Sequence, residues 1–288
     1  MNSLRHKLNN ELALSGFAAS TQINYVRSVA HLAEYYHRPP DRISPQQVRD
    51  YLAYLVRGKG LQINSVYSIS KGLIFFYRRV LHWSEEDLST LRPRMKMPFK
   101  RPIIYSVEEI DRLLSCKGLF PRYRMFFMTA YATGMRLSEV CHLKVTDLLG
   151  DRHQIRVEQG KGKKDRYTIL FPKLLVELRK YWRLYRPEKW VFPGYKDPSR
   201  PMCPRTVQVV FGRTRRAVGL TDRGSLHALR HSFATHSLEF GVPLHILQAW
   251  LGHSQLKTTA GYLHYVQPDV KKLKSPLDLI DLNPIKGK

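Results

Sequence analysis

The chain has 288 residues, of which 48 are Lys or Arg and 23 are Asp or Glu, so its formal charge at neutral pH is +25. Its 43% hydrophobic residues suffice for a packed core, which excludes a disordered basic tail, and its longest apolar runs are far too short to cross a membrane. Three widely spaced cysteines fit neither a disulfide framework nor a zinc site, so we expect a reduced, cytoplasmic protein of about two domains without a membrane partner.

The positive charge is spread along the whole chain. Residues 1–100 hold 15 basic and 7 acidic side chains, and residues 101–288 hold 33 and 16. A folded protein with so large an excess of cations is typical of nucleic-acid binding, because each phosphate contact releases counterions. A basic surface that is only solvated, or that attaches to a ribosome or an anionic membrane, is the alternative at this point.

Residues 1–83 predict four helices joined by short connections, a small helical bundle. The polar residues expected to begin these helices are Ser3, Ser20, Ser44 and Asn64. Ser44 is the clearest start, because Pro45 follows it at the first helical position, and this third helix is expected to run to about Val56.

The composition changes between residues 91 and 103. This segment has three prolines, five basic residues and no acidic residue. A stiff, positive linker suits a chain that wraps a duplex with one domain on each side, although an ordinary solvated linker is the alternative. The basic residues that we expect to contact DNA here are Arg92, Arg94, Lys96, Lys100 and Arg101.

Beyond the linker the pattern is helical with one β-hairpin. Ser106 and the acids that follow it have the arrangement of a capping box at a helix start. Helical patterns return at 125–132 and 137–143, and two β-rich stretches, 154–158 and 166–170, flank a turn rich in glycine and lysine. The rest, to about residue 274, is again mainly helical. The sequence therefore predicts a mainly α protein with a small β-hairpin or sheet.

One candidate site residue follows a predicted helix end. Gly134 can terminate a helix, which places Arg136 at the start of the next helix and Glu139 one turn further on, where it can orient the guanidinium. Such a pair is usually a solvated ion pair, so this signal is weak by itself.

Two further groups of polar residues lie near the C-terminal end. His227 and Arg230 are three residues apart and share one helix face, opposite an apolar stripe; a polar face with a capping histidine is the alternative. Gly252 is expected to end a helix and Ser254 to cap the next, with His253 at the junction. Tyr262 is then expected at the far end of that following helix.

In this order and spacing, the strings resemble the active-site motifs of tyrosine recombinases, the phage-integrase family, and in particular its short Xer-type members. The matching strings are ATGMRLSEV with Arg136, QGKGKKDR with Lys161, HALRHSFATH with His227 and Arg230, and LGHSQLKTTAGY with His253 and Tyr262. The resemblance covers about residues 2–270.

The resemblance implies a two-domain, C-shaped DNA clamp. Residues 1–90 are expected to form a four-helix, SAM-like domain that binds core DNA, and 91–103 the basic linker. Residues 104–270 are expected to form a mixed α/β catalytic domain, and 271–288 a tail that contacts another subunit. We expect its segment 275–282 to dock there.

The resemblance also implies a reaction. Tyr262 attacks the scissile DNA phosphate, which gives a 3′-phosphotyrosyl bond and a free 5′-hydroxyl. Lys161 protonates the leaving 5′-oxygen, and His227 assists proton transfer at the nucleophile. The bond energy is kept in the phosphotyrosyl link, so no ATP or other cofactor is expected. The sequence has no clustered acidic set, which agrees with a reaction without metal.

The remaining site residues are expected to hold the phosphate. Arg136 and Arg230 contact its non-bridging oxygens, because a planar guanidinium matches phosphate and stabilises charge in the transition state. His253 is expected to donate a hydrogen bond to the same phosphate, and Glu139 to orient Arg136.

Some positions keep alternatives. Lys163 and Lys164 flank Lys161 on the hairpin and are alternatives for the catalytic lysine, but the motif register favours Lys161, and we expect the other two to contact DNA. Tyr265 is a minor alternative to Tyr262. The other histidines of this region are interpreted as capping or core residues; they are His231, His236, His245 and His264.

The function that we expect is site-specific recombination of double-stranded DNA with inverted half-sites, by four protomers on two sites. The free protein is expected to be a monomer or weak oligomer, and the active one to be associated with the nucleoid. A mobile-element integrase is favoured over an Xer-like resolvase of chromosome or plasmid dimers. A non-catalytic DNA-binding protein and a relaxing topoisomerase are less favoured alternatives.

Overall fold

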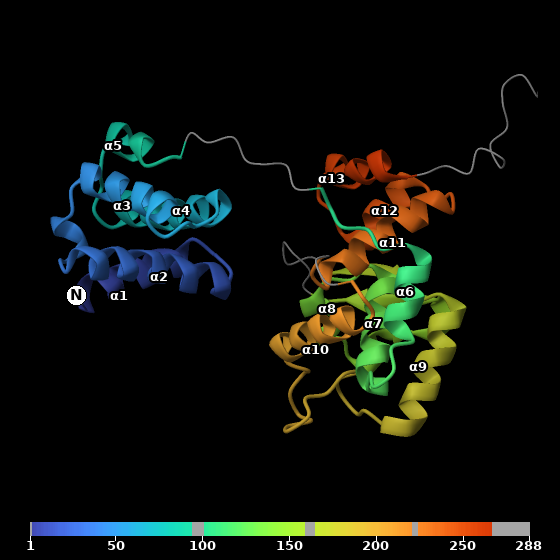
Figure 1. Ribbon diagram of the computed structural model, residues 1–288. Helices are drawn as coiled ribbons and strands as arrows, with labels where there is room; N and C mark the ends of the chain where they lie inside the picture. The colour runs from blue at the N-terminus through green and yellow to red at the C-terminus, as the bar shows by residue number, and fades with distance from the viewer. Residues whose placement is uncertain (1, 94–100, 159–164, 221–223, 267–288) are drawn as a thin grey trace, which may run out of the picture. The chain divides into compact units, whose positions relative to one another are not determined.

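The computed structural model describes residues 2–93, 101–158, 165–220 and 224–266. The chain divides into two compact units, Met1–Lys100 and Arg101–Lys288 (Figure 1). The described residues are mostly helical, with one small antiparallel sheet of three strands, as the sequence predicts.

The first unit is a bundle of helices. They are α1 (Asn2–Leu14), α2 (Ala19–Tyr36), the 3₁₀ turn η1 (Pro40–Arg42), α3 (Pro45–Arg57), α4 (Ile63–Arg79) and α5 (Glu85–Thr90). The four predicted helices are present, and α5, which Ser84 caps, is an additional short one. Helices α2 and α4 approach closely at Gly72, where a Cβ atom would lie 3.1 Å from the Cα of Tyr25.

Local capping chemistry predicts some helix starts and not others. Ser44 forms a complete capping box with Gln47 and precedes Pro45, as predicted. The predictions of caps at Ser3, Ser20 and Asn64 are wrong, because each of these residues lies inside its helix. A cap contributes about 1 kcal/mol, which the burial of an apolar helix face readily outweighs.

The second unit contains the sheet and the remaining helices. The helices are α6 (Val107–Leu114), α7 (Pro121–Thr133), α8 (Leu137–Cys141), α9 (Pro172–Tyr185), α10 (Pro204–Ala217), α11 (His227–Glu239), α12 (Leu244–Leu251) and α13 (Leu256–Ala260). The strands are β1 (Leu148–Leu149), β2 (Gln154–Val157) and β3 (Arg166–Ile169), in the order β1-β2-β3. Three 3₁₀ turns are η2 (Val145–Asp147), η3 (Gly150–Arg152) and η4 (Gly261–Tyr265).

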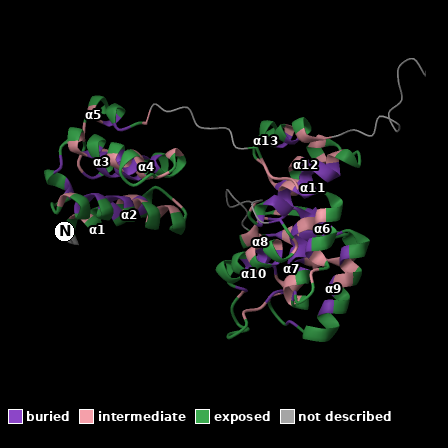
Figure 2. Cartoon of the chain, viewed as in Figure 1, coloured by how far each residue is buried: buried purple, intermediate pink, exposed green. Residues whose placement is uncertain are grey.

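Helix α11 lies in the middle of this unit. It is buried along most of its length and packs against α7, α12 and η4 (Figure 2). The sheet joins this core through Thr168 of β3, whose hydroxyl donates a hydrogen bond to the carbonyl oxygen of Thr133 at the end of α7. The ends of α7, α12 and β3 are thereby gathered around α11, which is where the candidate site lies.

Candidate active site

A tight turn after α7 places Arg136. Gly134 ends that helix with φ +62°, a conformation that favours glycine, and a Cβ atom there would lie 2.4 Å from the ring of Phe233. The chain therefore reverses directly against α11, and Arg136 becomes the N-cap residue of α8. This is the placement that the sequence predicts.

Glu139 holds two arginines. It accepts hydrogen bonds from the backbone N–H of Arg136 at 2.7 Å and from its guanidinium at 2.9 Å. Two nitrogens of Arg166 donate to its two carboxylate oxygens, each at 2.8 Å. Burial by itself raises the pKa of Glu139, but the hydrogen bonds and charges of the two arginines lower it to about 2. The carboxylate is therefore ionised and fixes both guanidinium groups.

Arg166 is a site residue that the sequence reasoning missed, although it is the last letter of the string QGKGKKDR. It projects from β3, and its Nε donates to the carbonyl oxygen of Trp250 at 3.1 Å. Its side chain lies over Gly252, where a Cβ atom would be 2.5 Å from the Cδ of Arg166. Arg166 thus connects the sheet to the start of α8 and the end of α12.

Arg230 is the most deeply buried charge of the site, with 2% of its surface exposed. Its guanidinium donates to the carbonyl oxygens of Gly134, at 2.6 Å, and Leu251, at 2.7 Å. Burial, followed by the charge of Arg136, lowers its pKa to about 10, so Arg230 is still a cation at neutral pH. The same group lies 2.9 Å from Nε2 of His253.

The contact with Arg230 decides which nitrogen of His253 carries the proton. An arginine only donates, so Nε2 of His253 accepts, and Nδ1 donates to the hydroxyl of Thr259 at 3.0 Å. Burial first, and then the surrounding arginines, lower the pKa of His253 to about 4. In this structure His253 is therefore a neutral hydrogen-bond acceptor toward Arg230.

Tyr262 is the second residue of η4, which follows α13 directly, and is only 7% exposed. The predicted cap at Ser254 is wrong, since α13 begins after Gln255 without a side-chain cap. The Tyr262 ring is nearly parallel to that of His253, with ring centroids 6.4 Å apart. Burial raises the pKa of Tyr262, and Arg230 and Arg136 partly oppose the shift, so the hydroxyl is protonated at neutral pH.

The histidine that contacts Tyr262 is His231. Its Nδ1 lies 2.9 Å from the tyrosine hydroxyl. The interpretation of His231 as a capping or core residue is therefore corrected: it sits beside the candidate nucleophile because α11 packs against η4. His227 lies one turn earlier on α11 and meets the His231 ring edge to face, with centroids 4.6 Å apart. His236 is a core residue, bonded to the hydroxyl of Tyr131.

The structure brings together Arg136, Glu139, Arg230, His253 and Tyr262, with His227 next to them. Other predicted site residues lie outside the described residues: Arg94, Lys96, Lys100, Lys161, Lys163 and Lys164. Arg101 is exposed at the beginning of the second unit's described part, and Tyr265 is half-buried.

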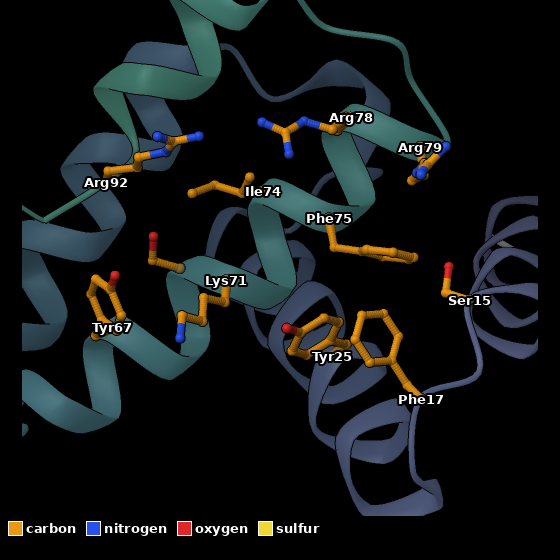
Figure 3. Close-up of a pocket in the computed structure, with 11 residues that line it drawn as sticks. Ser15, Phe17, Tyr25, Tyr67, Lys71, Ile74, Phe75, Arg78, Arg79 and Arg92 are labelled. Carbon is orange, nitrogen blue, oxygen red and sulfur yellow. The ribbon is translucent and has the colours of Figure 1, made fainter. Parts of the chain in front are cut away.

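Arg92 lines a pocket of the first unit, between α2, α4 and the segment after α5. Lys71, Arg78 and Arg79 of α4 line the same pocket, next to aromatic rings that include Tyr25. Figure 3 shows the guanidinium groups of Arg92 and Arg78 directed toward one another across it. This pocket, which we call the basic pocket, gathers cations that the sequence reasoning did not single out, apart from Arg92.

Comparison with known proteins identifies the two units. Residues 106–267 match the sequence model of the phage integrase family, and residues 4–85 match the N-terminal SAM-like domain of phage integrases. The chain belongs to the phage integrase family. Its membership makes it a tyrosine-type site-specific recombinase, as the motif strings predict.

Relatives in this family match along most of the chain. A protein of Sinorhizobium fredii that is named as an integrase/recombinase is 37% identical over 97% of this chain and 90% of its own length. The tyrosine recombinase XerA of Pyrococcus furiosus is 32% identical over 81% of this chain and 82% of its own. A lambda integrase tetramer bound to a Holliday junction shares the fold, with a TM-score of 0.71, 20% identity and coverage of 96% of this chain and 79% of that chain.

The described residues of this integrase were also compared with the requirements of a membrane span and of a metal site. None of its described helices is long and apolar enough to cross a membrane. Within the same residues, no three His, Cys, Asp or Glu side chains lie together in a way that could hold a metal ion. The predicted absence of metal from the reaction stays a prediction.

Proposed function

We propose that this integrase cuts and rejoins DNA strands at specific sites through a 3′-phosphotyrosyl intermediate formed by Tyr262. The observation that carries the proposal is the location of Tyr262: it is buried, its ring stacks on His253, and Arg230 contacts that same histidine at 2.9 Å. The charges of Arg230 and Arg136 both act on its hydroxyl. A nucleophile beside two fixed guanidinium groups suits attack on a phosphodiester, because those groups neutralise the charge that develops on the phosphate oxygens.

In the proposed reaction Arg136 and Arg230 bind the non-bridging oxygens of the scissile phosphate. Glu139 keeps Arg136 in place, so little conformational freedom is lost when the phosphate binds. The negative phosphate favours protonation of His253, after which Nε2 of His253 donates a hydrogen bond to a phosphate oxygen. Lys161 is proposed to protonate the leaving 5′-oxygen, and neither a metal ion nor ATP takes part.

The basic pocket is proposed to bind the DNA backbone. Four cations line one pocket and attract phosphates, although Arg78 also pairs with Glu85 at 2.8 Å, and the neighbouring rings provide an apolar floor. Arg101 and the linker lysines and arginines are proposed as further backbone contacts, with Lys163 and Lys164 doing the same from the hairpin. Double-stranded DNA with inverted half-sites is the proposed substrate.

Four protomers are proposed to act on two sites; a lambda integrase of the same fold is bound to a Holliday junction as a tetramer. The segment 275–282 of one protomer is proposed to dock on the next. Its apolar residues match an apolar groove of the second unit that is formed by α6, α7, α9 and α11. The residues that line this groove include Met128, Phe171, Phe233, Phe240 and Val242.

Among recombination reactions, we favour integration of a mobile element, carried out in the cytoplasm on nucleoid DNA. A relative named as an integrase/recombinase matches nearly the full chain. The relative named XerA keeps dimer resolution as the second candidate. Strand exchange between two non-identical sites would support integration, whereas exchange confined to directly repeated identical sites would support resolution.

The covalent intermediate provides the test. Duplexes that the protein binds are selected from a random-sequence library, nicked near the cleavage point to trap the cleaved strand, and incubated with the wild-type protein and with Tyr262→Phe. We expect a protein–DNA adduct that survives denaturation for the wild type and none for Tyr262→Phe. An adduct with both proteins, or with neither, would refute the proposal. Strand exchange between two selected sites then distinguishes recombination from simple relaxation.

A further inference from the structure

The hydroxyl of Tyr262 already has a hydrogen-bond partner that the expected reaction does not use. That partner is Nδ1 of His231, at 2.9 Å. His227, which the motif assigns to proton transfer at the nucleophile, contacts His231 through its ring, with centroids 4.6 Å apart. In the described part of the chain the order of contact is thus His227, His231, Tyr262.

Chemistry fixes the direction of this hydrogen bond. Tyr262 is a phenol at neutral pH, because burial raises its pKa, and a phenol is a better donor than a neutral imidazole. Loss of solvent around the ring, and then His227 and Arg230, lower the pKa of His231 to about 4, so it is neutral and has one nitrogen free to accept. Nδ1 therefore accepts the hydroxyl proton and Nε2 carries the ring hydrogen.

We propose that His231 is the proton acceptor for the nucleophile. When Tyr262 attacks, its O–H bond breaks and the proton passes to Nδ1 of His231, while the phenolic oxygen forms its bond to phosphorus. The bond between phosphorus and the 5′-oxygen breaks, and that oxygen leaves as a hydroxyl after gaining a proton at the other side of the site. His231 is left as an imidazolium, and the reverse transfer restores it on rejoining. This inference rests on the proposed function and assigns one step within it.

Bound DNA makes His231 a stronger base. In the free protein its basicity is reduced partly by the positive charge of Arg230. A phosphate on Arg230 and Arg136 adds negative charge within the same site, which opposes that effect and stabilises the imidazolium. The proton is thus transferred readily only when the phosphate is in place.

The titratable and charged groups that act on His231 are His227 and Arg230 of α11 and Tyr262 of η4. The other charged groups of the site contact one another: Glu139 binds Arg136 and Arg166, and His253 contacts Arg230. Of the first three groups, Tyr262 hydrogen-bonds His231 and His227 meets its ring. His227, which the motif assigns to the same proton transfer, is therefore the competing candidate with which His231 is compared.

The experiment compares His231→Asn with His227→Asn on the nicked duplexes selected by the wild-type protein. The amide oxygen that His231→Asn introduces can accept the hydroxyl hydrogen bond but cannot take up the proton at neutral pH. We expect both variants to bind the duplex within about twofold of the wild type. Adduct formation should fall about 100-fold or more with His231→Asn, the range of general base catalysis, and much less with His227→Asn.

Two measurements separate a proton acceptor from a residue that only positions Tyr262. First, the wild-type cleavage rate should rise with pH until His231 is neutral and then level off, and this rise should be absent with His231→Asn. Second, a duplex whose leaving 5′-oxygen is replaced by sulfur needs no proton on the leaving group. The loss with His231→Asn should persist on that duplex, because the missing group acts at the nucleophile.

The results that would refute the role of His231 differ from those that would refute the proposed function. If wild type forms no Tyr262-dependent adduct, the proposed function is refuted. If wild type forms it, and His231→Asn cleaves at the wild-type rate or keeps its pH dependence, the role of His231 is refuted. A larger loss with His227→Asn, or rescue of His231→Asn by the sulfur substrate, would also refute that role.

Discussion

Replacing Glu139 by Gln should strongly destabilise the second unit, because one buried carboxylate pairs with two arginines there. Its side chain is 7% exposed, and its pKa is lowered from 4.5 to about 2. One pKa unit corresponds to about 1.4 kcal/mol. If the unfolded chain has the ordinary pKa, this difference in the pKa of Glu139 stabilises the folded state by about 3 kcal/mol at neutral pH. Gln keeps the shape and one acceptor oxygen but leaves Arg166 and Arg136 without a counter-charge.

The effect should depend on pH in a defined direction. Because the folded chain lowers this pKa, the contribution is complete above pH 4.5 and disappears as the pH falls toward 2. The difference in the free energy of unfolding between the wild type and Glu139→Gln should therefore fall from about 3 kcal/mol at pH 7 to about half of that at pH 3.

Urea unfolding followed by tryptophan fluorescence measures this difference, since Trp182, Trp190 and Trp250 report on the second unit. Glu158→Gln is the matched control, because Glu158 pairs with Lys144 and Arg156 at the surface, where solvent screens the charges. We expect the control to change stability little at either pH. Equal losses for the two variants, or a loss at Glu139 that does not change with pH, would refute the reasoning.

Three other changes test separate parts of the structure. Gly134→Ala should lower the urea midpoint more than Gly219→Ala. Both glycines have positive φ, but only at Gly134 would the added Cβ meet a ring, that of Phe233. Equal decreases in the urea midpoint would mean that the close contact with α11 does not make Gly134→Ala more destabilising. Arg92→Gln should weaken DNA binding and reduce the slope of log affinity against log salt by about one, whereas Arg38→Gln, exposed elsewhere, should leave the slope unchanged. Deletion of 275–282 should impair strand exchange far more than half-site binding, in contrast to deletion of 283–288; unchanged exchange would exclude docking of the tail.

Local rules and motif spacing predicted a large part of this chain. Ser44, Ser106, Gly134 and Gly252 act at the positions where helix-capping chemistry places them. The predicted caps at Ser3, Ser20, Asn64 and Ser254 fail, because a single cap is weak compared with packing of the helix face. The mainly α fold with a small sheet was predictable because its elements depend on short-range pattern.

The parts of the site that were not predicted depend on contacts between distant elements. Arg166 reaches Glu139 across 27 positions, and His231 reaches Tyr262 across 31. Neither pair has a spacing that one helix or one hairpin would bring together. His231 in particular follows a motif arginine directly, and only the packing of α11 against η4 places its Nδ1 at the tyrosine hydroxyl.

The same contacts that hold the second unit together also keep its candidate site positively charged. Arg230 is bonded to the carbonyl oxygens that end α7 and α12, so its charge is fixed by the fold. Glu139 compensates Arg136 and Arg166 only in part, and burial keeps His231 and His253 neutral. In the proposed reaction, a bound phosphate would add negative charge beside these arginines and would make both histidines more basic when Tyr262 loses its proton.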